Sequence, residues 1–219
     1  MCVSCDVSMK LMNDSLIVLS PTPEITRVDD TVYDLVLFTT EDAWSDRIWN
    51  KTRRWRDMVE LYHKHYSFQA VYFTRNPMII DMFSNTSVKI VSEFELTRFN
   101  LPVITNMFMI VSKMYDALYY GYVNADILLE YTVFDALKFL QMSVKKGDLY
   151  PQHELAGRVY EKSYDSIPSS FHDLDSLKYF FNSLTVSPRT RRNHGSAVGL
   201  SIQLHHRITL SFLVSLFLL

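Results

Sequence analysis

The sequence predicts an α/β fold, in which a mostly parallel sheet carries helices on both of its faces. Short runs rich in β-branched and aromatic residues alternate along the chain with longer segments whose apolar residues recur at helical intervals. Such alternation is typical of parallel strands joined by crossover helices. The chain has 219 residues, 48% of them apolar, which is enough to bury one substantial core. In such a fold, ligands bind at the carboxyl ends of the strands.

The first strand and the first helix are predicted one directly after the other. Thr31–Thr40 is a run of strand length, and helical spacing prevails from Glu41 to Lys64. We expect Thr40 to cap this helix, because a threonine hydroxyl can accept a hydrogen bond from the first helical turn. The tryptophans of the helix are expected in the core, and its arginines mostly on the other side.

The same two patterns predict three further strands and three further helices. The strands are Ser67–Thr74, Ser87–Phe94 and Tyr119–Leu129; the helices run from Pro77 toward Phe83, over Ile104–Leu118, and from a cap at Thr132 to Lys145, Lys146 and Gly147. Only five glycines occur, and none precedes Gly121. Neither a G-x-G-x-x-G fingerprint nor a P-loop can therefore follow the first strand, so a bound nucleotide would need a cation or side chains instead.

Charge and metal-ligand patterns exclude other classes of function. The 22 basic and 24 acidic residues give a net charge of -2, so we expect no nucleic acid as a partner. The two cysteines, Cys2 and Cys5, form one C-x-x-C without the second pair that a structural zinc site needs. No H-E-x-x-H motif occurs, which disfavours a zinc hydrolase.

Four segments are expected along the chain. Residues 1–30 form an N-terminal extension, 31–182 the domain, 183–207 an irregular basic segment and 208–219 an apolar C-terminal tail. A membrane span needs about 20 residues, so the tail is expected to be a partial anchor, a last core element or a segment foreign to the domain. If exposed, it would contact a membrane or a partner chain. No signal peptide is visible at the N-terminus, and the localisation stays open.

The strongest functional clue is the pair of polar residues Asn124 and Asp126 inside the strand-like run YYGYVNADILL. Side chains at positions i and i+2 of an extended chain point the same way, so these two could converge on a metal ion or a sugar hydroxyl. The alternative is an Asn-x-Asp turn, in which both side chains bond the local backbone. The residue pattern leaves both interpretations open.

Five segments between Thr31 and Phe181 occur in an informative order. They are VLFTT (Val36–Thr40), the helix with Arg47, Ile48, Asn50, Thr52 and Trp55, NLPVITNMF (Asn100–Phe108), YYGYVNADILL (Tyr119–Leu129) and AGRVY (Ala156–Tyr160). In these motifs and their order, the chain resembles the nucleotide-diphospho-sugar transferase-like proteins, whose fold is the Rossmann-like GT-A fold of glycosyltransferases.

The resemblance implies that Asn124-Ala125-Asp126 is a DXD-type motif, which holds a divalent cation on the diphosphate of a nucleotide-sugar donor. Manganese is the expected ion, with Asp126 as its principal ligand and Asn124 as a second oxygen donor. The cation would neutralise the departing diphosphate and so lower the barrier to glycosyl transfer. Because Asn124 replaces an acid, weaker metal binding is expected.

The resemblance also implies roles for four other residues. Thr39 and Thr40 would meet the nucleoside, and Arg47 its phosphates; helix capping and surface solvation are the alternatives. Arg158 would present its guanidinium to a phosphate or sugar, with a structural ion pair as the alternative.

Beyond about Asn182 the sequence departs from the family pattern, and we expect a GT-A domain that is cut short or remodelled. The leading hypothesis is a glycosyltransferase that transfers a sugar to an unknown acceptor, with no catalytic base assigned. The alternative is a non-catalytic GT-A-like binding or interaction protein that has lost its acceptor half. The resemblance alone points to the secretory pathway or the Golgi.

Overall fold

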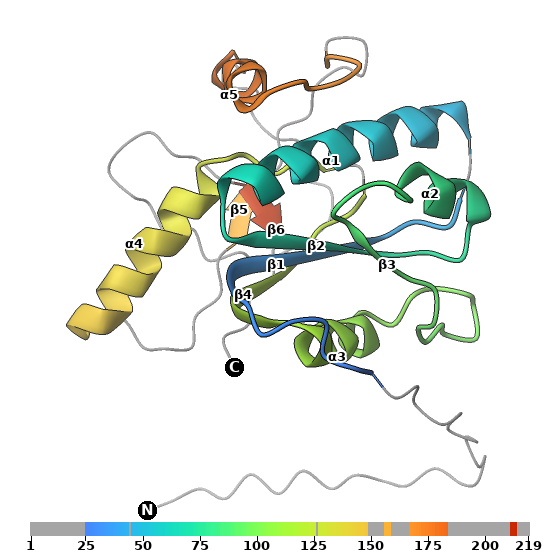
Figure 1. The fold of residues 1–219 in the computed structure, drawn as a ribbon, viewed down its shortest axis with the longest axis horizontal. Helices are drawn as coiled ribbons and strands as arrows, with labels where there is room; N and C mark the ends of the chain where they lie inside the picture. The colour runs from blue at the N-terminus through green and yellow to red at the C-terminus, as the bar shows by residue number, and fades with distance from the viewer. Residues whose placement is uncertain are drawn as a thin grey trace, which may run out of the picture.

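The computed structural model describes residues 25–43, 45–125, 127–148, 156–158, 167–183 and 211–213. Its main feature is a four-stranded sheet of parallel strands in the order β3-β2-β1-β4 (Figure 1). These strands are β1 (Val32–Thr40), β2 (Phe68–Phe73), β3 (Lys89–Val91) and β4 (Asp116–Tyr122). The predicted α/β architecture, with a parallel sheet and flanking helices, is confirmed.

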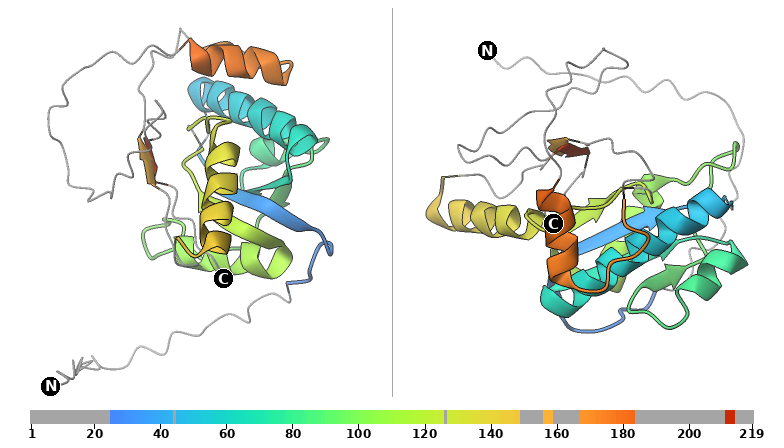
Figure 2. Two further views of the ribbon diagram at one scale, coloured as in Figure 1. Left: turned by 90° about the vertical axis from the view of Figure 1, so that its left-hand side faces the viewer. Right: turned by 90° about the horizontal axis from the view of Figure 1, so that it is seen from above.

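Five helices accompany the strands in the described ranges, and they cover both faces of the sheet. They are α1 (Asp46–His65), α2 (Pro77–Met82), α3 (Ile104–Met114), α4 (Val133–Lys146) and α5 (Leu174–Asn182). Helices α1 and α2 lie on one face and α3 on the other, while α5 lies on the outer side of α1 (Figures 1 and 2). No helix in the described ranges is long and apolar enough to cross a membrane.

The two faces of β1 belong to two separate core clusters. Leu35 and Leu37 pack with α1, whereas Val36 and Phe38 pack with α3, as the alternation of side chains along a strand requires. On the α1 face Trp55 is fully buried, and its ring meets the ring of Tyr72 edge-on at 5.3 Å between centroids. The expected core position is therefore confirmed for Trp55; Trp44 lies outside the described residues.

The order of the strands creates a switch point between β1 and β4. From β1 the chain passes through α1 to β2 and then to β3, moving outward on one side of β1. Helix α3 then returns the chain across the opposite face to β4, which pairs with the other side of β1. The strand order therefore reverses at β1 and β4, and ligands of open parallel sheets bind at the carboxyl ends of the strands at such a switch point.

The start of the first helix differs from the prediction. Thr40 is still part of β1, in register with Phe73, and helix α1 begins only at Asp46. Its N-cap is Ser45, whose Oγ accepts a hydrogen bond from the backbone N of Ile48 at 3.2 Å. The predicted cap at Thr40 is wrong, because strand pairing continues through Thr40 and a loop separates the strand from the helix.

The boundary between α3 and β4 also differs from the prediction. Helix α3 ends at Met114 rather than Leu118, and β4 covers Asp116–Tyr122 rather than residues 119–129. Aromatic and aliphatic residues suit either element here, and pairing with β1 decides in favour of the strand. At the start of α4, Thr132 occupies the N-cap position, but its side chain makes no capping hydrogen bond.

A segment far along the chain is fixed to α1 by arginines. Arg54 is only 7% exposed, and its guanidinium donates to the carbonyl oxygens of Pro168 at 2.7 Å and Ile167 at 2.9 Å. The neighbouring Arg53 donates to the carbonyl of Ser169 at 2.8 Å. The expectation that the arginines of this helix lie mostly away from the core is therefore wrong for Arg54, because its charge is satisfied by backbone carbonyls.

A small antiparallel pair joins β5 (Ala156–Arg158) to β6 (Ser211–Leu213). Ala156 is in register with Leu213, so part of the apolar tail pairs with the AGRVY segment. The rest of the tail, most of residues 1–30 and nearly all of the basic segment 183–207 lie outside the described residues.

Candidate functional site

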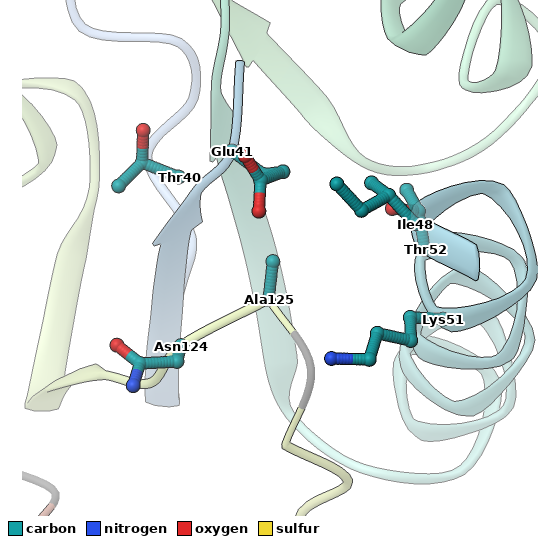
Figure 3. Close-up of a pocket in the computed structure, with 7 residues that line it drawn as sticks. All are labelled: Thr40, Glu41, Ile48, Lys51, Thr52, Asn124 and Ala125. Atoms are coloured by element: carbon teal, nitrogen blue, oxygen red, sulfur yellow. The ribbon is translucent and has the colours of Figure 1, made fainter. Parts of the chain in front are cut away.

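A hollow of about 260 Å³ opens at the switch point between β1 and β4, beside the first turns of α1 (Figure 3). Three parts of the chain form it: the end of β1, the segment after β4 and one side of α1. The lining residues are Thr40, Glu41, Ile48, Lys51, Thr52, Asn124 and Ala125. This is the place where ligands bind in open parallel sheets.

Two of the predicted site residues, Thr40 and Asn124, line the hollow. Thr39 is fully buried, on the α1 face of β1 that Leu35 and Leu37 also occupy, and does not line the hollow. Arg47 is exposed near the start of α1 and does not line it either.

The other two predicted site residues cannot be placed against the hollow. Asp126 lies outside the described residues, and so does the side chain of Arg158, whose backbone belongs to β5. Their roles stay predictions.

The chain turns at Asn124 instead of continuing as a strand. The backbone N of Val123 still donates to the carbonyl of Phe38 at 3.1 Å, and the N of Ile127 then donates back to the carbonyl of Asn124 at 3.0 Å. The amide oxygen Oδ1 of Asn124 accepts a hydrogen bond from the Tyr122 hydroxyl at 3.1 Å. The predicted strand therefore ends before Asn124, and the orientation of Asp126 stays a prediction.

Three polar lining residues were not predicted as ligand contacts: Glu41, Lys51 and Thr52. In Figure 3, Glu41 from the loop and Lys51 from α1 both extend into the hollow, whereas the side chains of Thr40 and Asn124 point away from α1. Glu41 also accepts a hydrogen bond from the backbone N of Ala43 at 2.8 Å, which shapes its loop. The hollow thus presents a carboxylate and an ammonium group on the side of α1.

The sequence carried a signal for the residues of α1. Positions 48, 52 and 55 lie on one helical stripe, and Thr52 is polar within an otherwise apolar stripe, with Lys51 beside it. A polar residue inside a buried stripe needs a partner, which is a reason to look for a ligand.

Several hydroxyl groups at this end of the sheet are buried without a hydrogen-bond partner of good geometry within the described ranges. Two of them belong to Thr40 and Thr52, which line the hollow. Two others belong to Thr39 and Tyr72, which do not line it. Burial raises the pKa of Tyr72, while the nearby Thr52 hydroxyl acts in the opposite direction. An unsatisfied buried hydroxyl costs about 1–3 kcal/mol, so a polar ligand or water in the hollow would be favoured.

The hollow offers oxygen atoms of the types that a divalent cation needs. Thr40, Glu41 and Asn124 supply hydroxyl, carboxylate and amide oxygens, the donor types that hard cations prefer. In the part of the chain that the structure describes, no group of three or more His, Cys, Asp or Glu side chains is placed to hold a metal ion. The oxygen types therefore fit a hard cation, although only Glu41 contributes negative charge among the described lining residues.

Comparisons of the sequence with protein-family models and with curated proteins gave no match. The geometry of this hollow and the motifs in the sequence are therefore the basis for inferring a function.

Proposed function

We propose that the protein binds a nucleotide-diphospho-sugar in the hollow between β1 and β4 and acts as a glycosyltransferase of the GT-A type. The observation that carries this proposal is that three of the five resembling segments meet there. The end of VLFTT contributes Thr40, the first helix contributes Ile48 and Thr52, and YYGYVNADILL contributes Asn124 and Ala125. These segments are far apart in sequence, and the switch point brings them to one place.

In this proposal the nucleotide-sugar lies across the carboxyl ends of β1 and β4. Asn124 and Asp126 hold a divalent cation, manganese in particular, whose charge would stabilise the departing diphosphate. The chain's own residues bind and orient the donor: hydroxyl and amide groups of Thr40 and Asn124 offer hydrogen bonds, and Glu41 accepts them from sugar hydroxyls.

A non-catalytic binding protein is the second candidate. It is favoured by the small number of acids in the hollow, where Glu41 is the single carboxylate among the described lining residues. Metal-assisted transfer to a hydroxyl acceptor needs ligands for the cation and, in many enzymes, a base as well. A protein that only binds the donor needs fewer of them.

Calorimetric titration of the full chain tests the proposal. UDP and GDP are titrated with and without manganese into the native protein and into Asp126→Ala. Asp30→Ala is the matched control, since Asp30 is exposed and precedes β1 at the opposite end of the sheet. We expect metal-enhanced binding that is lost in Asp126→Ala and retained in Asp30→Ala.

Two results would separate or reject the candidates. Release of nucleoside diphosphate from a nucleotide-sugar in the presence of manganese would support the enzyme, while binding without release would favour the binding protein. If the folded native chain binds neither nucleotide under any condition, both candidates are wrong.

A further inference from the structure

We propose that the exposed face of α4 binds the surface of a membrane that contains anionic lipids. This face, the basic face of α4, consists of Lys138, Phe139, Met142, Lys145 and Lys146. It lies at the other end of the sheet from the hollow, so lipid binding here does not depend on the binding of a nucleotide-sugar.

The five residues of the basic face lie on one side of the helix. An α-helix turns by about 100° per residue, so they fall within an arc of about 120° that is centred on Met142. The other side of α4 packs on the core and carries the buried residues of the helix, which are Val133, Phe134, Ala136, Leu137, Leu140 and Ser143.

Two large apolar side chains are exposed on the basic face. Phe139 is 45% exposed and Met142 is 53% exposed. They are three residues apart on the helix, so their side chains are neighbours. Apolar side chains gain free energy when they leave water, and the interface of a bilayer accepts them without a pocket of matching shape.

The charges around these apolar side chains are mostly positive. Lys138, Lys145 and Lys146 are exposed, and none of them forms an ion pair with another described residue. The nearest acids in the sequence are Asp135 in the first turn and Asp148 beyond the end of the helix, while the whole chain has a net charge of -2. Charge complementarity therefore favours an anionic partner, whereas a second copy of the chain would place lysines against lysines.

The shape of this region favours a lipid surface over an acidic protein. Helix α4 extends outward beyond the other labelled helices and strands on its side of the molecule (Figures 1 and 2). Two apolar side chains bury far less than the roughly 800 Å² per partner of a stable protein interface. A peripheral membrane contact needs only shallow apolar insertion together with lysines near the lipid headgroups.

Aromatic contacts fix the start of α4 away from the hollow. The rings of Phe134 and Tyr66 are stacked with their centroids 3.9 Å apart, and Phe134 also meets Phe68, the first residue of β2, edge-on. Tyr66 directly follows α1, and it lies about 27 Å along this helix from Ile48, which lines the hollow. The basic face can therefore contact a bilayer while the hollow stays accessible.

Co-sedimentation of the full chain with lipid vesicles tests the proposal. The vesicles are made of phosphatidylcholine with or without phosphatidylserine, which is anionic. The lysine variant combines Lys138→Gln, Lys145→Gln and Lys146→Gln. The apolar variant combines Phe139→Gln and Met142→Gln. Circular dichroism checks that each variant is folded.

The matched control lies on another helix and combines Met109→Gln with Lys113→Gln. Met109 is 52% exposed, and Lys113, one turn later on α3, is exposed as well. The control therefore removes the same types of residue from the surface but leaves the basic face of α4 intact.

The native chain is expected to bind vesicles that contain phosphatidylserine, and to bind them less tightly as the salt concentration rises. One lysine near an anionic surface accounts for about fivefold in affinity, so the lysine variant should lose about a hundredfold. The apolar variant should lose about tenfold, and the control should stay within about twofold of the native chain.

Four results would overturn the proposal. The first is a native chain that does not bind the vesicles, and the second is equal binding with and without phosphatidylserine. The third is binding that persists in the folded lysine variant, which would assign the contact to another part of the chain, such as the apolar tail 208–219. The fourth is self-association of the native chain that is lost in the apolar variant, measured by sedimentation velocity, which would assign the face to a second copy.

Discussion

The two sides of β1 differ at the carboxyl edge of the sheet, although polar residues gather on both. On the side of β2, Asp42 closes a network: its Oδ1 accepts hydrogen bonds from the Thr74 hydroxyl at 2.8 Å and the Arg75 backbone N at 2.7 Å. Asn76 donates to the Asp42 carbonyl at 3.0 Å and also caps α2. The polar groups of this network satisfy one another.

On the side of β4, polar residues line a hollow instead of closing such a network. The Thr40 and Thr52 hydroxyls are buried without a hydrogen-bond partner of good geometry in the described ranges, and Glu41 and Lys51 extend into the hollow. Glu41 and Asp42 are neighbours in one loop, so residue type alone does not separate the structural acid from the candidate ligand contact. The difference lies in their hydrogen bonds: the side chain of Asp42 is bonded to the strand-β2 side of the sheet, whereas Glu41 bonds only within its own loop among the described contacts.

The largest effect on stability is expected when the hydrogen-bond network around Asp42 is broken. Asp42→Ala removes the acceptor of two hydrogen bonds and leaves the buried Thr74 hydroxyl without an acceptor for its proton, although Thr74 Oγ1 still accepts from the Asn76 backbone N at 3.1 Å. We expect a loss of about 2–3 kcal/mol in the free energy of unfolding, measured by urea denaturation. Glu41→Ala is the neighbouring control and should cost less than about 1 kcal/mol. Equal losses in the two variants would contradict the distinction between the two sides.

The next largest effect is expected on ligand affinity, when Glu41 in the hollow is changed. Glu41→Gln keeps an oxygen for the Ala43 backbone N but removes the negative charge. A hydrogen bond from a sugar hydroxyl to a carboxylate is stronger than one to an amide, so UDP binding should weaken by about tenfold. Calorimetry should show no such weakening for pyrophosphate, which has no sugar hydroxyl groups. Parallel weakening of both ligands would show that Glu41 does not meet the nucleoside.

A pair of buried threonines sharpens the comparison further. Thr52→Val removes a hydroxyl that has no hydrogen-bond partner of good geometry among the described residues, and should leave the free energy of unfolding unchanged or raise it by up to about 1 kcal/mol. Thr74→Val removes a hydroxyl that is bonded to Asp42 and should lower it by about 1 kcal/mol or more. Urea denaturation of both variants measures the difference, and a stability loss in Thr52→Val as large as in Thr74→Val would show that its hydroxyl is satisfied in the folded chain.

The smallest effect is expected at the residue that the resemblance named for the phosphates. Arg47 is exposed and does not line the hollow, so Arg47→Met should change UDP affinity by less than about twofold at physiological salt. Calorimetry with UDP compares this variant with the native chain. A larger loss of UDP affinity in Arg47→Met would indicate that Arg47 contacts the phosphates, as the resemblance implies.

Local pattern was sufficient to predict the alternation of elements and several details. The Lys-Lys-Gly end of α4 is an example, since Gly147 has a φ of 81°, the left-handed conformation that glycine adopts after a helix. The pattern did not predict the boundary between α3 and β4, where the residues suit a helix as well as a strand. It also did not predict the loop that separates β1 from Ser45, the N-cap of α1.

The site was harder to predict than the fold, for a physical reason. No local pattern states that β4 pairs with β1 rather than with β3, and it is this pairing that brings Asn124 to Thr40. Only the resemblance to a known family, which rests on the order of the motifs, suggested that Asn124 and Thr40 lie close together. Lys51 was missed because a lysine beside an apolar stripe is usually a solvated residue, and only the position of the hollow shows what it faces.

The arginines of α1 have a consequence for the extent of the folding unit. Helix α1 forms one wall of the hollow, and one turn of the same helix holds the carbonyl groups of Ile167 and Pro168 through Arg54. A shorter chain that stops at residue 166 would deprive this buried guanidinium of these two acceptors, at a cost of several kcal/mol. Truncation at residue 183 retains them together with α5. We therefore expect the first fragment to be cleaved rapidly by proteases and the second to resist.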